Sequence, residues 1–171
     1  TDSVTIQWTD NDTVEEEFVI ERKTGSGGTY AEIGRVDIDV TTYTDEPVTE
    51  GETYYYRVKA HNAWGESAYT AEVSALVPVS QTVSGSISSD ITWTSDTVYV
   101  VTGNMVVENG ATLTVDPGTR VEFDGAGAWY ILIKGTLIAR GTASEKIVFT
   151  SQATNPSADD WGYLKFFDES T

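Results

Sequence analysis

The sequence predicts an all-β protein, and three observations lead to this prediction. Threonine, valine, tyrosine and isoleucine dominate in short runs that alternate between apolar and polar residues. Gly, Asn-Asp and Pro-Gly sequences interrupt these runs, as turns do. Apolar residues with the spacing of a helix are nearly absent. A Ser-rich stretch at 77–90 divides the 171 residues, so we place a domain boundary there and expect units at 1–78 and 79–171.

The alternating runs of residues 1–78 predict antiparallel strands in a β-sandwich. Three consecutive tyrosines, 54–56, lie in the longest run, and alternation places Tyr54 and Tyr56 on the side of Val58. Tyr55 points to the opposite side with Arg57. Since the side that ends in Val58 is apolar, we expect it to face a core that also contains Val4, Ile6, Trp8, Phe18 and Ile20.

Four segments of this unit carry a family resemblance: "VTIQW", "FVIERKTG", "TTYTDEPV" and "GETYYYRVKAHNAWGES". Residues 3–76 resemble strands B, C, E and F of a fibronectin type III domain. The resemblance implies a two-sheet sandwich with Trp8 in the core and a hydrogen bond between the Tyr54 hydroxyl and a nearby backbone group. The sequence departs from the family pattern in one respect, because no segment precedes strand B to supply strand A.

A repeat organises residues 79–171. The segments 105–123 and 131–149 align, with glycine turns between short apolar strands. The spacing predicts two coils of a parallel β-helix, each of about 25 residues, in which equivalent positions stack. The expected pairs are Met105 with Ile131, Val107 with Ile133, Leu113 with Leu137, Val115 with Ala139, Val121 with Ile147, and Phe123 with Phe149, together with Gly110 with Gly135 and Gly118 with Gly141.

A third coil is expected to begin at 161–167, with Trp161 as the equivalent of Trp129 and an insertion at 151–160 before it. Residues 83–167 resemble the N-terminal end of right-handed parallel β-helix proteins of the pectate-lyase-like type. The resemblance implies that residues 82–101 cap the tube. It also implies a large extracellular microbial protein, such as a surface protein, an adhesin or a polysaccharide-processing enzyme. The predicted architecture is therefore a fibronectin type III-like β-sandwich followed by a truncated right-handed parallel β-helix.

Charge excludes two classes of partner. The chain has 27 acidic and 10 basic residues and a net charge of −17. Nucleic-acid backbones and anionic lipid surfaces require clusters of Lys and Arg, so we expect neither partner. No apolar run approaches the ~20 residues of a membrane helix, so no membrane insertion is expected in this segment. The chain has no cysteine, which excludes disulfides and thiolate metal sites.

The sequence offers few residues in patterns that are typical of catalytic sites. His61 is the one histidine, and no nucleophile or metal-protease motif accompanies it, so we expect no enzymatic activity from this chain. The acidic groups Glu15-Glu16-Glu17, Asp37/Asp39 and Asp45-Glu46 are interpreted as solvated surface. Asp159 and Asp160, with Asn155 in the same insertion, form the candidate cation site, and calcium is the one cofactor considered.

Aromatic side chains near turns are the second kind of candidate site. Flat Trp and Tyr rings can bind sugars, and Trp64, Trp129 and Tyr163 are the candidate ligand-facing residues. Tyr55 and Tyr69 belong to the same class. The alternative is that these rings close the ends of the two cores.

Two functions fit the sequence. The first is a non-catalytic extracellular structural or adhesive module of a microbial cell-surface or filament protein. The second is the leading non-catalytic portion of a secreted polysaccharide lyase or glycoside hydrolase, with a carbohydrate-binding role. Expected partners are an extracellular glycan or neighbouring protein subunits. Because an incomplete last coil and a missing strand A leave open β edges, we expect a fragment of a longer chain or self-assembly through those edges.

Overall fold

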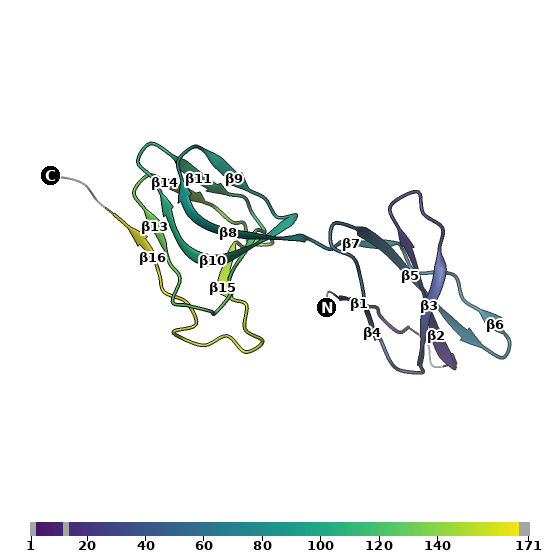
Figure 1. Ribbon diagram of the computed structural model, residues 1–171. Helices are drawn as coiled ribbons and strands as arrows, with labels where there is room; N and C mark the ends of the chain where they lie inside the picture. The colour runs from purple at the N-terminus through teal and green to yellow at the C-terminus, as the bar shows by residue number, and fades with distance from the viewer. Residues whose placement is uncertain (1–2, 12–13, 168–171) are drawn as a thin grey trace. The chain divides into compact units, whose positions relative to one another are not determined.

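The computed structural model describes residues 3–11 and 14–167, and all of its regular elements within these ranges are strands (Figure 1). The chain divides into two compact units, Thr1–Val77 and Pro78–Thr171. The described part of the chain contains no helix with the length and apolar character needed to span a membrane.

The first unit contains two antiparallel sheets. One pairs β1 with β4, and the other has the order β3-β2-β5, with β6 and β7 also paired to β5. The strands are β1 (Val4–Gln7), β2 (Glu17–Thr24), β3 (Ala31–Asp37), β4 (Thr42–Asp45), β5 (Thr53–Asn62), β6 (Gly65–Glu66) and β7 (Val73–Leu76).

Residues from both sheets form one core, as the alternation predicted. Tyr54, Tyr56 and Val58 are buried, whereas Tyr55 lies on the opposite face of β5 and is half-buried. The rest of the predicted core is also confirmed: Ile6, Phe18 and Ile20 are buried, and Val4 and Trp8 pack against them. The Tyr54 hydroxyl accepts a hydrogen bond of 3.0 Å from the backbone N–H of Thr49.

Two acidic residues predicted to be solvated are instead buried. Glu15 is 4% exposed and Asp45 is 5% exposed. Asp45 accepts two hydrogen bonds from Nη1 of Arg22, at 2.9 and 2.7 Å, and a third from the Tyr56 hydroxyl at 2.8 Å. Because Asp45 ends β4 and its two partners lie on β2 and β5, this group joins the two sheets. Sequence composition alone does not distinguish a buried, paired carboxylate from a solvated one.

The second unit is a stack of parallel coils. Its strands are β8 (Val79–Ile87), β9 (Ile91–Trp93), β10 (Thr97–Val107), β11 (Thr112–Val115), β12 (Arg120–Phe123), β13 (Ile131–Ile133), β14 (Thr136–Ala139), β15 (Val148–Ser151) and β16 (Leu164–Phe166).

Three parallel ladders build the stack. The first ladder runs from the second half of β8 through the second half of β10 to β13 and β16. The second ladder consists of β9, β11 and β14. The third begins with the first halves of β8 and β10 and continues through β12 and β15. The segment expected as a cap, residues 82–101, contributes a strand to each ladder and therefore forms a coil of its own.

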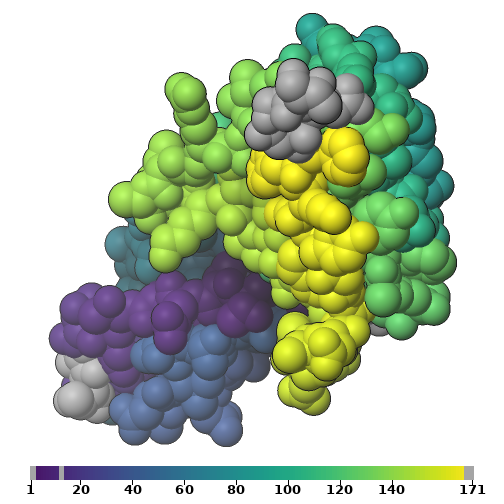
Figure 2. All heavy atoms as spheres, turned by 90° about the vertical axis from the view of Figure 1, so that its left-hand side faces the viewer, coloured from purple at the N-terminus to yellow at the C-terminus, as the bar shows by residue number. Residues whose placement is uncertain are grey.

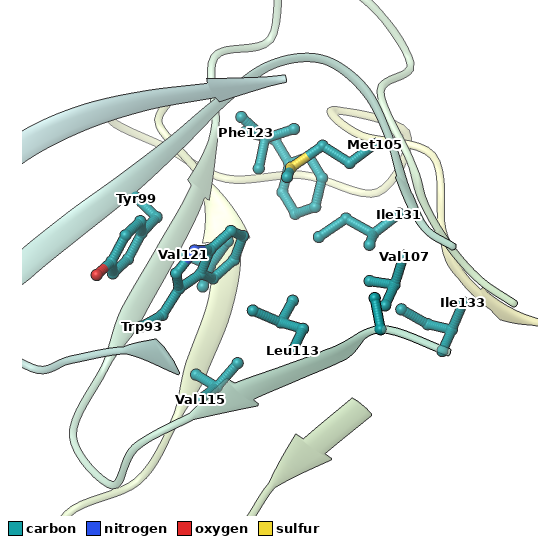
Figure 3. Close-up of a cluster of buried hydrophobic side chains, with 12 residues drawn as sticks. Trp93, Tyr99, Met105, Val107, Leu113, Val115, Val121, Phe123, Ile131 and Ile133 are labelled. Atoms are coloured by element: carbon teal, nitrogen blue, oxygen red, sulfur yellow. The ribbon is translucent and has the colours of Figure 1, made fainter. Parts of the chain in front are cut away.

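Inward side chains from all three ladders make one apolar core (Figure 3). Val101, Val107, Leu113, Val121, Phe123 and Ile131 are each 0% exposed. Trp93 stacks on Tyr99 with their ring centroids 4.5 Å apart, at the first coil. Continuous burial along the ladders is what parallel coils require, because each coil covers the next.

The repeat predicted the register of two ladders and missed the third. Met105 pairs with Ile131, and Leu113 pairs with Leu137, as expected. Val121, however, pairs with Phe149 rather than Ile147, and Phe123 pairs with Ser151 rather than Phe149. Likewise Gly118 lies against Glu145 and donates its N–H to the Glu145 carbonyl, so it has no counterpart in Gly141. The physical reason is the segment 140–147, which is longer than the equivalent 116–119 and moves the register by two residues.

The third coil also begins in a different register from the predicted one. Ile131 pairs with Leu164, which places Gly162, not Trp161, beside Trp129; the Gly162 N–H donates to the Trp129 carbonyl at 2.8 Å. Trp161 instead stacks on Phe123 with ring centroids 4.3 Å apart. Figure 2 shows residues 160–167 (yellow) at the surface of the second unit.

Candidate functional site

The turn between β5 and β6 presents the most exposed tryptophan that the structure describes. His61 pairs with Glu66 and Asn62 with Gly65, which leaves Ala63 and Trp64 at the tip. The Asn62 side chain fixes the turn: its Oδ1 accepts from the Trp64 backbone N–H at 2.9 Å, and its Nδ2 donates to the Val14 carbonyl at 2.9 Å. An Asn side chain that bonds backbone two residues on is a common turn device. The Trp64 ring is consequently held out in solvent, at 87% exposure.

An open groove of about 320 Å³ lies beside this turn. Its lining combines an indole ring with carboxylate, imidazole, amide and hydroxyl groups, supplied by Val14, Glu15, Ala60, His61, Asn62, Trp64, Gly65, Glu66 and Ser67. A second groove of about 300 Å³ is lined by Trp8, Asp10, Phe18, Lys59 and Tyr69, and it shares Glu15, Ala60 and Ser67 with the first. Grooves that combine an apolar surface with a few polar groups are typical of ligand sites.

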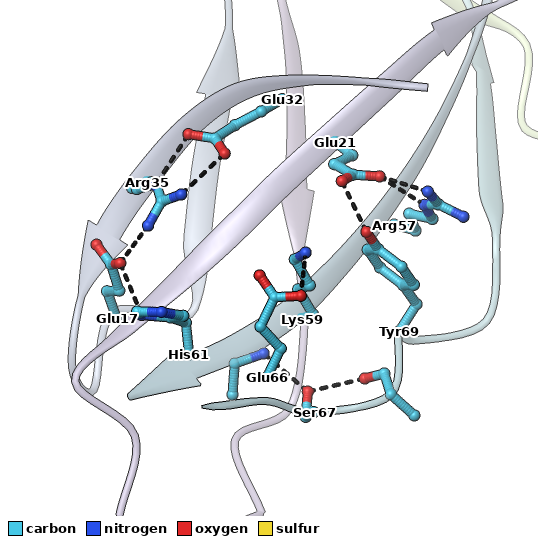
Figure 4. A network of polar contacts seen from close by, with 12 residues as sticks. Glu17, Glu21, Glu32, Arg35, Arg57, Lys59, His61, Glu66, Ser67 and Tyr69 are labelled. Atoms are coloured by element: carbon cyan, nitrogen blue, oxygen red, sulfur yellow. Dashed lines mark hydrogen bonds and ion pairs between the residues drawn. The ribbon is translucent and has the colours of Figure 1, made fainter. Parts of the chain in front are cut away.

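Two polar groups of the groove lie close to charged side chains outside it. Glu66 lies 2.7 Å from Nζ of Lys59, and Nδ1 of His61 lies 3.0 Å from Oε1 of Glu17 (Figure 4). Glu17 also contacts Arg35, which in turn pairs with Glu32. The side chains beside Trp64 are therefore held in place before any ligand arrives, which lowers the entropy cost of binding.

On the outer face of β5, tyrosine rings are in contact with basic side chains of the same unit. Arg57 lies between Tyr30 and Tyr69, with its Cζ 3.8 and 3.7 Å from the two ring centroids. Lys23 lies 5.0 Å from the Tyr55 ring centroid. These distances are those of cation–π contacts. Tyr55 and Tyr69 therefore use ring faces for contacts within the unit, which weakens their case as sugar platforms.

This face also contains a carboxylate with a shifted pKa. Glu21 accepts hydrogen bonds from the Tyr69 hydroxyl at 2.7 Å and from Nε of Arg57 at 2.8 Å. Burial alone raises the pKa of Glu21, but the hydrogen bonds and the positive charge of Arg57 outweigh burial and hold the pKa below its ordinary value.

The other two predicted aromatics lie in the second unit and are less free than Trp64. Trp129 is half-buried against the core, and its indole N–H donates to Oδ1 of Asp124 at 2.6 Å. Tyr163 is 47% exposed, but one ring face stacks on Tyr130 with centroids 5.0 Å apart. Trp64 belongs to the first unit, whereas Trp129 and Tyr163 belong to the second.

One carboxylate of the predicted calcium loop accepts hydrogen bonds from within the loop. Asp160 accepts hydrogen bonds from the Ser157 backbone N–H at 2.8 Å and from the Ser157 hydroxyl at 3.0 Å. Hydrogen bonds from Ser157 and Ser151 lower the pKa of Asp160. Asn155 and Asp159 are exposed. Among the described residues, the one group of three carboxylates close enough to share a metal ion lies elsewhere, at Asp10, Glu15 and Asp39.

Comparison with known proteins gives a family match to the second unit. The model of the pectate-lyase like beta helix domain matches residues 85–170, which is half of the chain. No curated protein matches the chain.

Solved structures give weaker similarities. Pectate lyase PelI from Erwinia chrysanthemi in complex with tetragalacturonic acid is 11% identical, with a TM-score of 0.41, over 97% of this chain and 74% of that one. Pectate lyase Pel3 from Pectobacterium carotovorum is 11% identical, with a TM-score of 0.38, over 87% and 75% of the two chains. The twitchin kinase region from C. elegans is 23% identical, with a TM-score of 0.39, over 44% of this chain, which spans 14% of that region.

Proposed function

We propose that this chain, which belongs to the pectate-lyase like beta helix domain family, is a non-catalytic extracellular module that attaches to a neutral glycan. The observation that carries the proposal is Trp64, whose ring is 87% exposed at the rim of a groove containing Asn62, His61 and Glu66. A flat indole face packs on the C–H face of a sugar ring, and the amide, imidazole and carboxylate groups can bond to sugar hydroxyls.

The charge of the chain favours a neutral glycan over an acidic one. With a net charge of −17, the protein repels a polyuronate at low ionic strength. The second unit supplies the structural part of the function. Its three continuous ladders make a stiff stack, since neighbouring coils are joined by backbone hydrogen bonds on every face.

The identity of the first unit is part of the proposal. A fibronectin type III-like sandwich is supported by its two antiparallel sheets around one core and by the bond between the Tyr54 hydroxyl and the Thr49 N–H. Sandwich units of this kind present their turns at the ends, and the Trp64 turn is one of them.

Isothermal titration of the full chain with a neutral oligosaccharide, cellohexaose, and with tetragalacturonate tests the proposal. We expect binding of the neutral sugar and a loss of at least about tenfold in affinity, equivalent to ~1.4 kcal/mol, for Trp64→Ala. The matched control is Tyr163→Ala, which removes an exposed ring of the second unit and should leave the affinity unchanged.

Two results would overturn the proposal. One is equal affinity of Trp64→Ala and the parent chain for cellohexaose. The other is the absence of binding to cellohexaose and to an array of other neutral glycans.

The second candidate function is the leading non-catalytic portion of a secreted polysaccharide lyase or glycoside hydrolase, and the family match over residues 85–170 favours it. Release of an unsaturated uronate or of reducing sugar by the purified chain, above the rate of a blank, would contradict both candidate functions, because each assigns no catalysis to this chain.

A further inference from the structure

Three carboxylates from two separate segments meet at one place in the first unit. Asp10 and Glu15 belong to the segment between β1 and β2, and Asp39 belongs to the turn between β3 and β4. One oxygen from each carboxylate lies within 4.8 Å of an oxygen from each of the others. Three like charges at this separation repel one another, and a bound cation would offset that repulsion.

The backbone holds the two segments side by side. The Trp8 N–H donates to the Thr41 carbonyl at 3.1 Å, and the Ile38 N–H donates to the Glu16 carbonyl at 3.2 Å. These bonds flank the acidic group on both sides. Asp39 adopts a left-handed conformation with φ of 66°, which Asp tolerates better than most residues. The carboxylates are therefore brought together by folded backbone rather than by adjacency in the sequence.

Burial of Glu15 is the second, independent observation. Its side chain is 4% exposed, and its Oε1 is buried with no hydrogen-bond partner among the described residues. A buried carboxylate oxygen without a partner is costly, and natural proteins pair such groups or use them as metal ligands. Lys59 lines the same groove as Asp10 and Glu15, but its Nζ lies 2.7 Å from Glu66.

We propose that Asp10, Glu15 and Asp39 form a calcium site that ties the β1–β2 segment to the β3–β4 turn. Calcium binds six to eight oxygen ligands at about 2.4 Å, so two of its ligands are at most about 4.8 Å apart. The separations among the three carboxylates match this limit. The ion also neutralises Glu15 where no hydrogen bond does. Water and backbone carbonyls complete such a shell in flexible calcium sites.

The site shares Glu15 with the lining of the groove beside Trp64. Its test nevertheless does not depend on sugar binding. The full chain, freed of metal with a chelator, is titrated with CaCl₂ in a calorimeter and melted with and without the ion. We expect one calcium per chain and a higher Tm in its presence, because a ligand that binds only the folded state stabilises it.

Two variants locate the site. Glu15→Gln keeps the shape of the side chain and removes its charge, and Asp39→Asn keeps a residue that tolerates the left-handed conformation. Each should weaken calcium binding by more than about tenfold and remove most of the calcium-dependent rise in Tm. The matched control is Asp159→Asn in the insertion of the second unit, which also has a positive φ and should bind calcium as the parent chain does.

The outcomes decide between the two sites. No calcium-dependent heat and no change in Tm would overturn the proposal, as would a Glu15→Gln chain that binds calcium with the parent affinity. Loss of binding in Asp159→Asn alone would assign calcium to the insertion and would equally contradict a site at Glu15. Circular dichroism of each variant without calcium checks that the strands are retained.

Discussion

The two units bury very different kinds of side chain. Inside the coils of the second unit, the largest buried side chains are aliphatic or aromatic, and Thr97, Thr119 and Ser151 are the buried polar residues that the structure describes there. The first unit, in contrast, buries the carboxylates of Glu15 and Asp45. The difference follows from topology. Stacked coils place each inward position on another inward position, so apolar packing suffices, whereas the sandwich joins its two sheets through Arg22, Asp45 and Tyr56.

The largest expected effect tests the apolar core of the coils. Phe123→Ala removes a ring that is 0% exposed and that stacks on Trp161. We expect the free energy of unfolding of the second unit to fall by about 3–5 kcal/mol. Urea unfolding, monitored by hydrogen exchange of the amides in 79–167, measures this free energy. Phe167→Ala, at an exposed position, is the matched control, and a loss for Phe123→Ala no greater than the control's would contradict the packing argument.

A smaller effect tests the polar link between the sheets of the sandwich. Tyr56→Phe keeps the buried ring and removes the hydroxyl that donates to Asp45 at 2.8 Å. Because a hydrogen bond to a charged group is stronger than a neutral one, we expect a loss of about 1.5–3 kcal/mol in the unfolding free energy of the first unit. Tyr55→Phe, on the outer face of the same strand, should change it little. Equal losses for the two variants would show that the contact with Asp45 contributes nothing of its own.

The smallest expected effect is a pH dependence of the unfolding free energy of the first unit alone. The pKa of Glu21 is lower in the folded chain than its ordinary value of 4.5, so the folded state favours the ionised form. The stabilisation is complete above pH 4.5 and is lost as the pH falls through the folded pKa. We expect Glu21→Gln to cost less than about 1 kcal/mol at neutral pH and nothing at the acid end.

Urea midpoints measured across this range for the parent chain and Glu21→Gln should therefore converge as the pH falls. Tyr69→Phe, which removes one of the hydrogen bonds to Glu21, should give an intermediate slope. Midpoints that stay a constant distance apart would argue against the lowered pKa.

The sequence predicts local alternation well and connection lengths poorly. Period-2 spacing places Tyr54 and Tyr56 inside because each strand is read from its own residues. The predicted partner of Val121 was wrong because the pairing depends on the length of the connection 140–147. The alignment of glycine turns did not determine that length. The turn beside Trp64 made this residue a candidate for exposure, with closure of the end of the core as the alternative. The burial of Glu15 was not predicted, because it arises from tertiary packing, which brings residues as distant in the sequence as Asp39 close to it.

The connection between the third and first ladders, at one corner of the coils, varies in length from coil to coil, whereas the strands that it joins do not. Between the third and first ladders the chain crosses by residues 102–104 in one coil, by 124–130 in the next and by 152–163 in the last. The strands on either side keep their parallel pairing each time. Since doubling the length of a flexible loop costs only ~0.6 kcal/mol, this corner is the natural position for grafting foreign peptides. The stack can thus serve as a display scaffold whose inserted epitopes emerge from one edge at the spacing of its coils.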